Sequence, residues 1–246
     1  MYVQNEWHLG KVIEVEKHYP GNYGAPGVPR SKKRKRTPED IARQNLTNKN
    51  KRVQRLILAN FKEGDWHLIL KYRPGQRPEV FDEAKQHLKQ FVSDMRKAYK
   101  AAGVPFKYIA VTERGKRGQA LHHHLVIEDI ATEQVNTVKL VKKFWPGTEA
   151  FVDLYEDGDY KKLAEYIVKK ETKEDGTWAT YTRSRNLITP KPIRKIINRK
   201  RWSLDPKPKK GYYVVKDSIV NGFNPVTEYP YQHYTMKLID PGGDTS

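Results

Sequence analysis

Two short runs rich in β-branched and aromatic residues, Phe106–Glu113 and Ala120–Ile127, constrain the fold most strongly. A basic, glycine-bearing stretch, Arg114-Gly115-Lys116-Arg117-Gly118, joins them, and this order is typical of a β-hairpin. A hairpin pairs its two strands antiparallel. Helix-like and strand-like segments alternate along the rest of the chain, so the pattern predicts an α+β fold in which helices pack on an antiparallel sheet.

The segments around this hairpin have clear periodicities. Apolar residues from Phe81 to Tyr99 recur every three or four positions, which predicts an amphipathic helix that ends at Gly103. Thr37-Pro38-Glu39-Asp40 is typical of a helix N-terminus. The whole prediction places helices over about 37–60, 81–99, 132–143 and 160–170, and strands over 66–72 and 150–154.

The net charge of +18 is unevenly distributed along the chain. Residues 182–210 contain 11 Lys and Arg but one acid, and residues 30–36 form a second basic block. Runs of like charge resist burial, so we expect a basic flexible N-terminal arm at 1–36, a folded domain at 37–190 and a basic Pro/Tyr-rich C-terminal extension at 191–246. The basic excess predicts a polyanionic partner.

Several classes of protein are excluded by what the sequence lacks. The absence of cysteine excludes disulfides, thiolate metal sites and cysteine nucleophiles. There is no run of about 18 apolar residues and no secretory pattern at the start, so we expect an intracellular protein without a membrane span. No P-loop occurs, so any DNA unwinding would come from another protein.

The second run of the hairpin contains three consecutive histidines. Because successive side chains of a strand point to opposite faces, His122 and His124 project together and His123 projects away. Glu113 ends the preceding strand, and the hairpin brings its carboxylate beside the pair. One carboxylate and two neutral imidazoles could bind Mg²⁺ or Mn²⁺, with Zn²⁺ as an alternative. The competing interpretation is that the histidines are structural and Glu113 is solvated.

A later predicted helix offers a nucleophile. Tyr166 and Lys169 are three residues apart and share a helix face. A tyrosine hydroxyl is a weak nucleophile until a cation or a base stabilises its oxyanion, and a nearby lysine with a metal ion would do so. The alternative is an ordinary tyrosine beside a solvated lysine.

The order of these motifs resembles the HUH endonuclease superfamily, and within it the rolling-circle replication initiators of phages and small plasmids. The resemblance rests on Glu…His-x-His in a hairpin, followed by Tyr-x-x-Lys on a helix about forty residues later. Three further stretches resemble replication-associated proteins, namely Asn60–Leu68, Tyr108–Glu113 and Ser184–Leu187. The resemblance covers about residues 53 to 190.

This resemblance implies a fold, a site and a mechanism. The fold would be an antiparallel, about five-stranded sheet flanked by helices, with the tyrosine helix facing the histidine strand. Glu113, His122 and His124 would hold a divalent metal ion, Mg²⁺ or Mn²⁺; Tyr166 would be the nucleophile and Lys169 its helper. The protein would nick single-stranded origin DNA through a 5′-phosphotyrosine, leave a 3′-OH primer for rolling-circle replication, and rejoin strands. Host helicase and polymerase would be partners, in the cytoplasm of a bacterial host of the phage or plasmid.

Basic and aromatic residues interleave in the late segment, as in surfaces that combine phosphate contacts with base stacking. The predicted DNA-binding residues are Arg183, Arg185, Arg194, Lys195, Arg199, Lys200 and Arg201. A solvated, flexible basic segment is the alternative. Two other functions stay open: a non-catalytic DNA- or RNA-binding protein, and a relaxase or single-strand transposase of the same superfamily. Tyr160 and Tyr181 are alternative nucleophiles.

Overall fold

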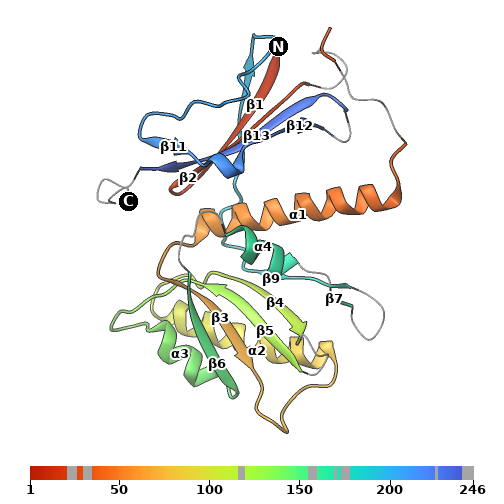
Figure 1. Cartoon of the computed structure of the whole chain (residues 1–246). Helices are drawn as coiled ribbons and strands as arrows, with labels where there is room; N and C mark the ends of the chain where they lie inside the picture. The colour runs from red at the N-terminus through yellow and green to blue at the C-terminus, as the bar shows by residue number, and fades with distance from the viewer. Residues whose placement is uncertain are drawn as a thin grey trace. The chain divides into compact units, whose positions relative to one another are not determined.

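The computed structural model describes residues 1–20, 27–29, 35–115, 120–154, 160–168, 171–172, 178–224 and 227–239, with backbone alone at 171–172 and 178–179. The chain divides into two compact units, whose elements are labelled in Figure 1. The central unit is Gln44–Ile188, and the terminal unit is Met1–Arg43 with Thr189–Ser246. None of the described helices is long and apolar enough to cross a membrane.

The long helix α1 (Pro38–Asn60) begins where the sequence predicts. Thr37 caps it, because its Oγ1 accepts the Asp40 backbone N–H at 3.2 Å while its own N–H donates to the Asp40 carboxylate at 3.1 Å. This reciprocal arrangement satisfies N–H groups that have no partner within the helix.

The central unit contains an antiparallel five-stranded sheet. Its strands, in spatial order, are β6 (Thr148–Leu154), β3 (Asp65–Lys71), β5 (Leu121–Ile127), β4 (Tyr108–Arg114) and β9 (Thr182–Arg183). The remaining elements are α2 (Phe81–Ala101), α3 (Thr137–Phe144), α4 (Lys161–Val168), β7 (Glu171–Thr172) and β8 (Trp178–Ala179). Strands β4 and β5 pair as the predicted hairpin. The predicted α+β fold, with an antiparallel sheet and flanking helices, is confirmed.

Helix α2 packs along one face of this sheet (Figure 1), because its apolar stripe matches the apolar side of the strands. Phe91 and Met95 from the helix share one buried cluster with Leu70 and Leu125 from the strands. Burying each side chain of this kind contributes about 1.5–3 kcal/mol. The cluster occupies the face to which Leu125 points, and strand alternation leaves His124 on the other face.

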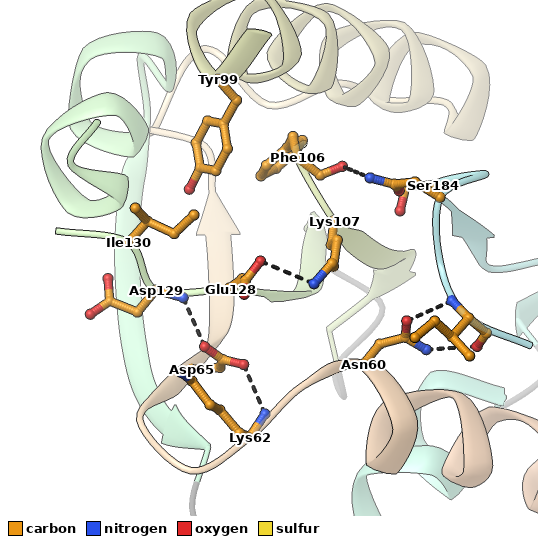
Figure 2. A network of polar contacts seen from close by, with 12 residues as sticks. Asn60, Lys62, Asp65, Tyr99, Phe106, Lys107, Glu128, Asp129, Ile130 and Ser184 are labelled. Carbon is orange, nitrogen blue, oxygen red and sulfur yellow. Dashed lines mark hydrogen bonds and ion pairs between the residues drawn. The ribbon is translucent and has the colours of Figure 1, made fainter. Parts of the chain in front are cut away.

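A buried carboxylate fixes the position of β3 against β5. Asp65 accepts the backbone N–H of Lys62 at 2.8 Å and that of Asp129 at 2.9 Å, as Figure 2 shows. Burial raises the pKa of Asp65, and these two backbone donors oppose the rise. The contacts join the chain before β3 to the chain after β5, and so maintain the register in which His67 lies opposite Val126.

His123 lies on the helix face of the sheet, opposite to its two neighbours. It is buried, with Nε2 2.7 Å from the Tyr72 hydroxyl and Nδ1 2.9 Å from Thr112 Oγ1. Its ring also packs edge-on against Trp145. Burial, with a smaller effect of His122, lowers the pKa of His123 to about 3, so the ring is neutral at neutral pH. The middle histidine is therefore a core residue.

Replacing His123 by alanine should destabilise the central unit by about 2–4 kcal/mol, since it leaves a cavity and removes a partner from two buried hydroxyls. Urea unfolding followed by circular dichroism measures this. Gln86→Ala, at an exposed position of α2, is the control and should stay within about 0.5 kcal/mol. Equal midpoints for both variants would contradict the core role of His123.

The terminal unit contains a second, six-stranded antiparallel sheet. Its strands are β10 (Ile193–Ile197), β1 (Tyr2–Leu9), β2 (Val12–His18), β13 (Pro230–Leu238) and β11 (Tyr212–Val214) in spatial order, with β12 (Val220–Phe223) also paired to β13. A short 3₁₀ helix, Lys216–Ser218, precedes β12. The two ends of the chain thus build one sheet.

Strands β1 and β2 correct the expectation of a flexible arm at 1–36. Val3 and Val15 are buried, and β2 pairs with β13 from the opposite end of the chain. The basic block at 30–36 does not extend to these strands, so its charge does not oppose their burial. Residues 21–26 and 30–34 of the expected arm lie outside the described residues. The region 191–246, expected as an extension, likewise supplies strands of this sheet.

Candidate functional site

Glu113, His122 and His124 lie together where β4 pairs with β5, and Glu113 is directly opposite His122. Glu113 Oε1 lies 3.1 Å from His122 Nε2 and 3.5 Å from His124 Nε2. The three side chains are 8, 15 and 7% exposed, respectively. One ligand atom from each lies within 4.8 Å of the others, so the group could bind one metal ion.

The second ring nitrogen of each histidine faces a partner that orients the ring. His122 Nδ1 lies 3.2 Å from the carbonyl oxygen of Ala120, which can only accept, so Nδ1 carries the proton. His124 Nδ1 lies 3.0 Å from Nε2 of His67 on β3, and donates to it in the tautomer that leaves His124 Nε2 unprotonated. Both Nε2 atoms then direct lone pairs toward Glu113.

This arrangement places acceptors against each other. Unprotonated His122 Nε2 and the Glu113 carboxylate, 3.1 Å apart, repel unless a positive charge lies between them. A proton on the imidazole or a divalent cation would supply that charge. The mixed nitrogen and oxygen set, with each ring held from behind, therefore fits a divalent metal ion.

The pKa shifts favour the protonation state that metal binding requires. Burial raises the pKa of Glu113, but hydrogen bonds from His122, His124 and Tyr166 outweigh burial and hold this pKa well below its usual range. Burial lowers the pKa of His124, and burial with the nearby His124 lowers the pKa of His67 to about 4. A carboxylate and neutral imidazoles are the ligand forms of these groups.

Helix α4 brings Tyr166 to the same group. The Tyr166 hydroxyl donates to Glu113 Oε1 and lies 2.7 Å from His124 Nε2. Buried Ala164 and Ile167 anchor the other side of the helix. The hydroxyl therefore lies beside the atoms that would hold a metal ion, which is where a nucleophile for a metal-bound phosphate is needed.

The other residues considered with Tyr166 have different surroundings. Tyr160 is buried immediately before α4. The Tyr181 ring faces Lys49, whose Nζ lies 5.7 Å from the ring centre. The predicted helper Lys169 lies outside the described residues.

The Glu113 group opens into a cleft of about 710 Å³. Its lining includes Tyr166 and three cationic residues that sequence reasoning missed, namely Lys71, Arg73 and Arg77. Lys71 is paired with His122 in the sheet, and its carbonyl oxygen accepts the indole N–H of Trp145 at 2.9 Å. The basic composition of the Pro/Gly loop after β3 was the available signal. His67 was also missed, because its contact with His124 joins residues far apart in sequence.

The predicted DNA-binding residues fall in both units. Arg183 and Arg185 belong to the central unit, at and after β9. The other five lie on or after β10 of the terminal unit, and they are Arg194, Lys195, Arg199, Lys200 and Arg201. Lys195 Nζ lies 3.8 Å from the buried Glu6 carboxylate, while its side chain stays half exposed. All seven residues are accessible enough to contact a polyanion.

A second group with ligand spacing occurs in the terminal unit. Glu14, Glu16 and His233 have ligand atoms within 4.8 Å of one another, and His233 Nε2 lies 2.8 Å from Glu14 Oε1. This close pair forms without a metal ion if the imidazole is protonated. The group matters here as a control for metal-binding measurements on the central unit.

The central unit is thus an α+β domain in which a Glu/His/His group, a tyrosine hydroxyl and several cations share one cleft. Residues 65–175 match the family model of the ORF2-type replication-associated proteins. This match spans β3 through α4, the part of the chain that forms the cleft, and it supports a replication initiator. No curated protein and no solved structure matches the chain.

Proposed function

We propose that this protein is a replication initiator that nicks single-stranded DNA at an origin, using Tyr166 as nucleophile, and later rejoins the strand. The observation that carries the proposal is the Tyr166 hydroxyl at Glu113 and His124, within a cationic cleft. The match to the replication-associated family supports the biological setting. Host helicase and polymerase, in the cytoplasm of a bacterial host, would complete replication.

The reaction follows from the positions of these groups. Tyr166 Oη would attack the phosphorus of the scissile phosphate and form a 5′-phosphotyrosine, while the bond from phosphorus to the 3′ oxygen breaks. The phenol loses its proton and the departing 3′ oxygen gains one, so a free 3′-OH remains to prime synthesis. A 3′-OH that attacks the phosphotyrosine reverses these steps and rejoins the strand without a nucleotide cofactor.

Glu113, His122 and His124 would hold the metal ion, Mg²⁺ or Mn²⁺ in this proposal. When bound, the ion would neutralise charge on the phosphate in the transition state. Lys71, Arg73 and Arg77 would bind neighbouring phosphates of the strand and orient it toward Tyr166. Lys169 would stabilise the phenolate, and the seven basic residues predicted from sequence would bind flanking DNA.

The test is a covalent-adduct assay. The full chain is incubated with Mn²⁺ and labelled single-stranded DNA from candidate origins, and the products are separated on a denaturing gel. We expect label that migrates with the protein, and a cleaved strand with a free 3′-OH. Strong binding with neither adduct nor cleavage on any tested strand would instead favour a non-catalytic nucleic-acid-binding protein.

His67 should act as a positioning residue for this site. His67→Ala removes the group that orients His124 Nδ1, and we expect a metal affinity about 10–100-fold lower, as for other partners of metal-bound histidines. Calorimetric titration with Mn²⁺ measures the affinity. His67→Gln, whose side-chain oxygen can accept the same hydrogen bond, should recover part of it. If both variants bind Mn²⁺ as the natural protein does, His67 does not orient His124.

A further inference from the structure

A second pocket, of about 880 Å³, lies in the central unit where β9 borders the start of β4. It is lined by Arg96, Lys100, Gly103, Val104, Pro105, Phe106, Tyr108, Arg183, Ser184, Arg185 and Asn186. Tyr108 and Glu113 are at opposite ends of β4, about 17 Å apart along the strand. The pocket is therefore distinct from the cleft at Glu113.

The lining of this pocket is strongly cationic. Arg96 and Lys100 come from α2, Arg183 and Arg185 come from the chain at β9, and no acidic residue belongs to the lining. Within the described part of the chain, Arg185 and the two cations of α2 form no ion pair, and Asp94 of α2 pairs with Lys97. Cations gathered around one hollow repel each other, so an anion bound there would be stabilised.

The C-terminus of α2 opposes anion binding, but weakly. Its partial negative charge is at most about half an elementary charge. Two of its last carbonyl groups already accept hydrogen bonds, Lys100 O from Gly103 N–H at 3.0 Å and Tyr99 O from Val104 N–H at 2.9 Å. Four full positive charges outweigh this contribution.

The wall that carries the two arginines is held in place. Buried Ser184 exchanges two hydrogen bonds with the Tyr108 backbone, through its N–H at 3.0 Å and its Oγ at 3.2 Å. The Asn186 side chain donates to the carbonyl oxygen of Phe106 at 3.3 Å, and Figure 2 shows Phe106 facing this segment. Arg183 and Arg185 therefore extend from a fixed backbone, which lowers the entropy lost on binding.

We propose that this pocket binds a phosphate and its attached nucleoside in single-stranded DNA, at a distance from the phosphate to be cut. Its volume suits a nucleotide better than a bare ion, since sites of roughly 300–1,000 Å³ hold organic ligands. Val104, Pro105 and Phe106 give the apolar surface that a sugar or base would contact. This inference rests on the proposed function, because it supplies a second attachment point for the same strand.

The test compares two double variants that carry the same change in charge. Arg96→Glu with Lys100→Glu reverses two cations of the pocket, whereas Lys89→Glu with Lys139→Glu reverses two exposed cations of the same unit outside it. Binding of a labelled single-stranded oligonucleotide is measured by anisotropy in chelator, as a function of salt. The result then depends on neither metal nor nicking, so it is distinguishable from failure of the proposed reaction.

We expect the pocket variant to bind at least tenfold more weakly, and its plot of log affinity against log salt to be shallower by about 0.7 for each phosphate that the pocket no longer neutralises. The control should change less than twofold. Equal effects of the two variants would overturn the proposal, as would displacement of the oligonucleotide by inorganic phosphate at the same phosphate concentration. Arg185→Gln, at an exposed position after β9, gives a second reading if the double variant unfolds.

Discussion

Tyr166→Phe should eliminate the covalent protein–DNA adduct and reduce nicking by on the order of 10⁴-fold or more, the effect of removing a nucleophile in other enzymes. The substitution removes the oxygen that contacts Glu113 and His124, and it leaves the ring and the apolar side of α4 intact. The adduct assay with Mn²⁺ measures the loss. Mn²⁺ binding should persist, because the three proposed ligands remain.

The controls are the two tyrosines that sequence alone left open. Tyr160→Phe and Tyr181→Phe make the same chemical change at positions beside α4 and beside Lys49. Both variants should form the adduct at a rate within severalfold of the natural protein. Persistent adduct in Tyr166→Phe, together with its loss in either control, would transfer the nucleophile to that tyrosine.

Local alternation was enough to predict the arrangement of the histidine strand. Side chains of a strand alternate between faces, so His122 and His124 had to share a face and His123 had to leave it. The structure places His123 in the core beside Tyr72 and Thr112. The position of Glu113 was predictable for the same reason, since a hairpin determines which residues of its strands lie opposite each other.

The residues that sequence reasoning missed depend on contacts between distant segments. His67 meets His124 only because β3 pairs with β5 across most of the central unit. The pairing of β2 with β13 joins opposite ends of the chain, and no periodicity within either strand indicates its partner. The pocket cations Arg96 and Lys100 lie on the exposed side of an amphipathic helix, where a sequence shows only solvated charge.

The metal site should bind Mn²⁺, and His122→Ala should abolish that binding. A ligand at about 100 times its Kd stabilises the folded protein by about 2.7 kcal/mol, so saturating Mn²⁺ should raise the melting temperature of the natural protein and chelator should reverse the rise. His122→Ala removes one of only three protein ligands. We expect more than about 100-fold weaker binding, a larger loss than for an outer partner such as His67, and no adduct formation.

The terminal unit provides the matched control for this experiment. His233→Ala removes the histidine of the other group with ligand spacing, and Mn²⁺ should still stabilise the variant and support nicking. Melting in chelator shows whether either substitution harms the fold itself. If Mn²⁺ stabilisation survives in His122→Ala and disappears in His233→Ala, the metal belongs to Glu14 and Glu16, because only that group has lost a ligand.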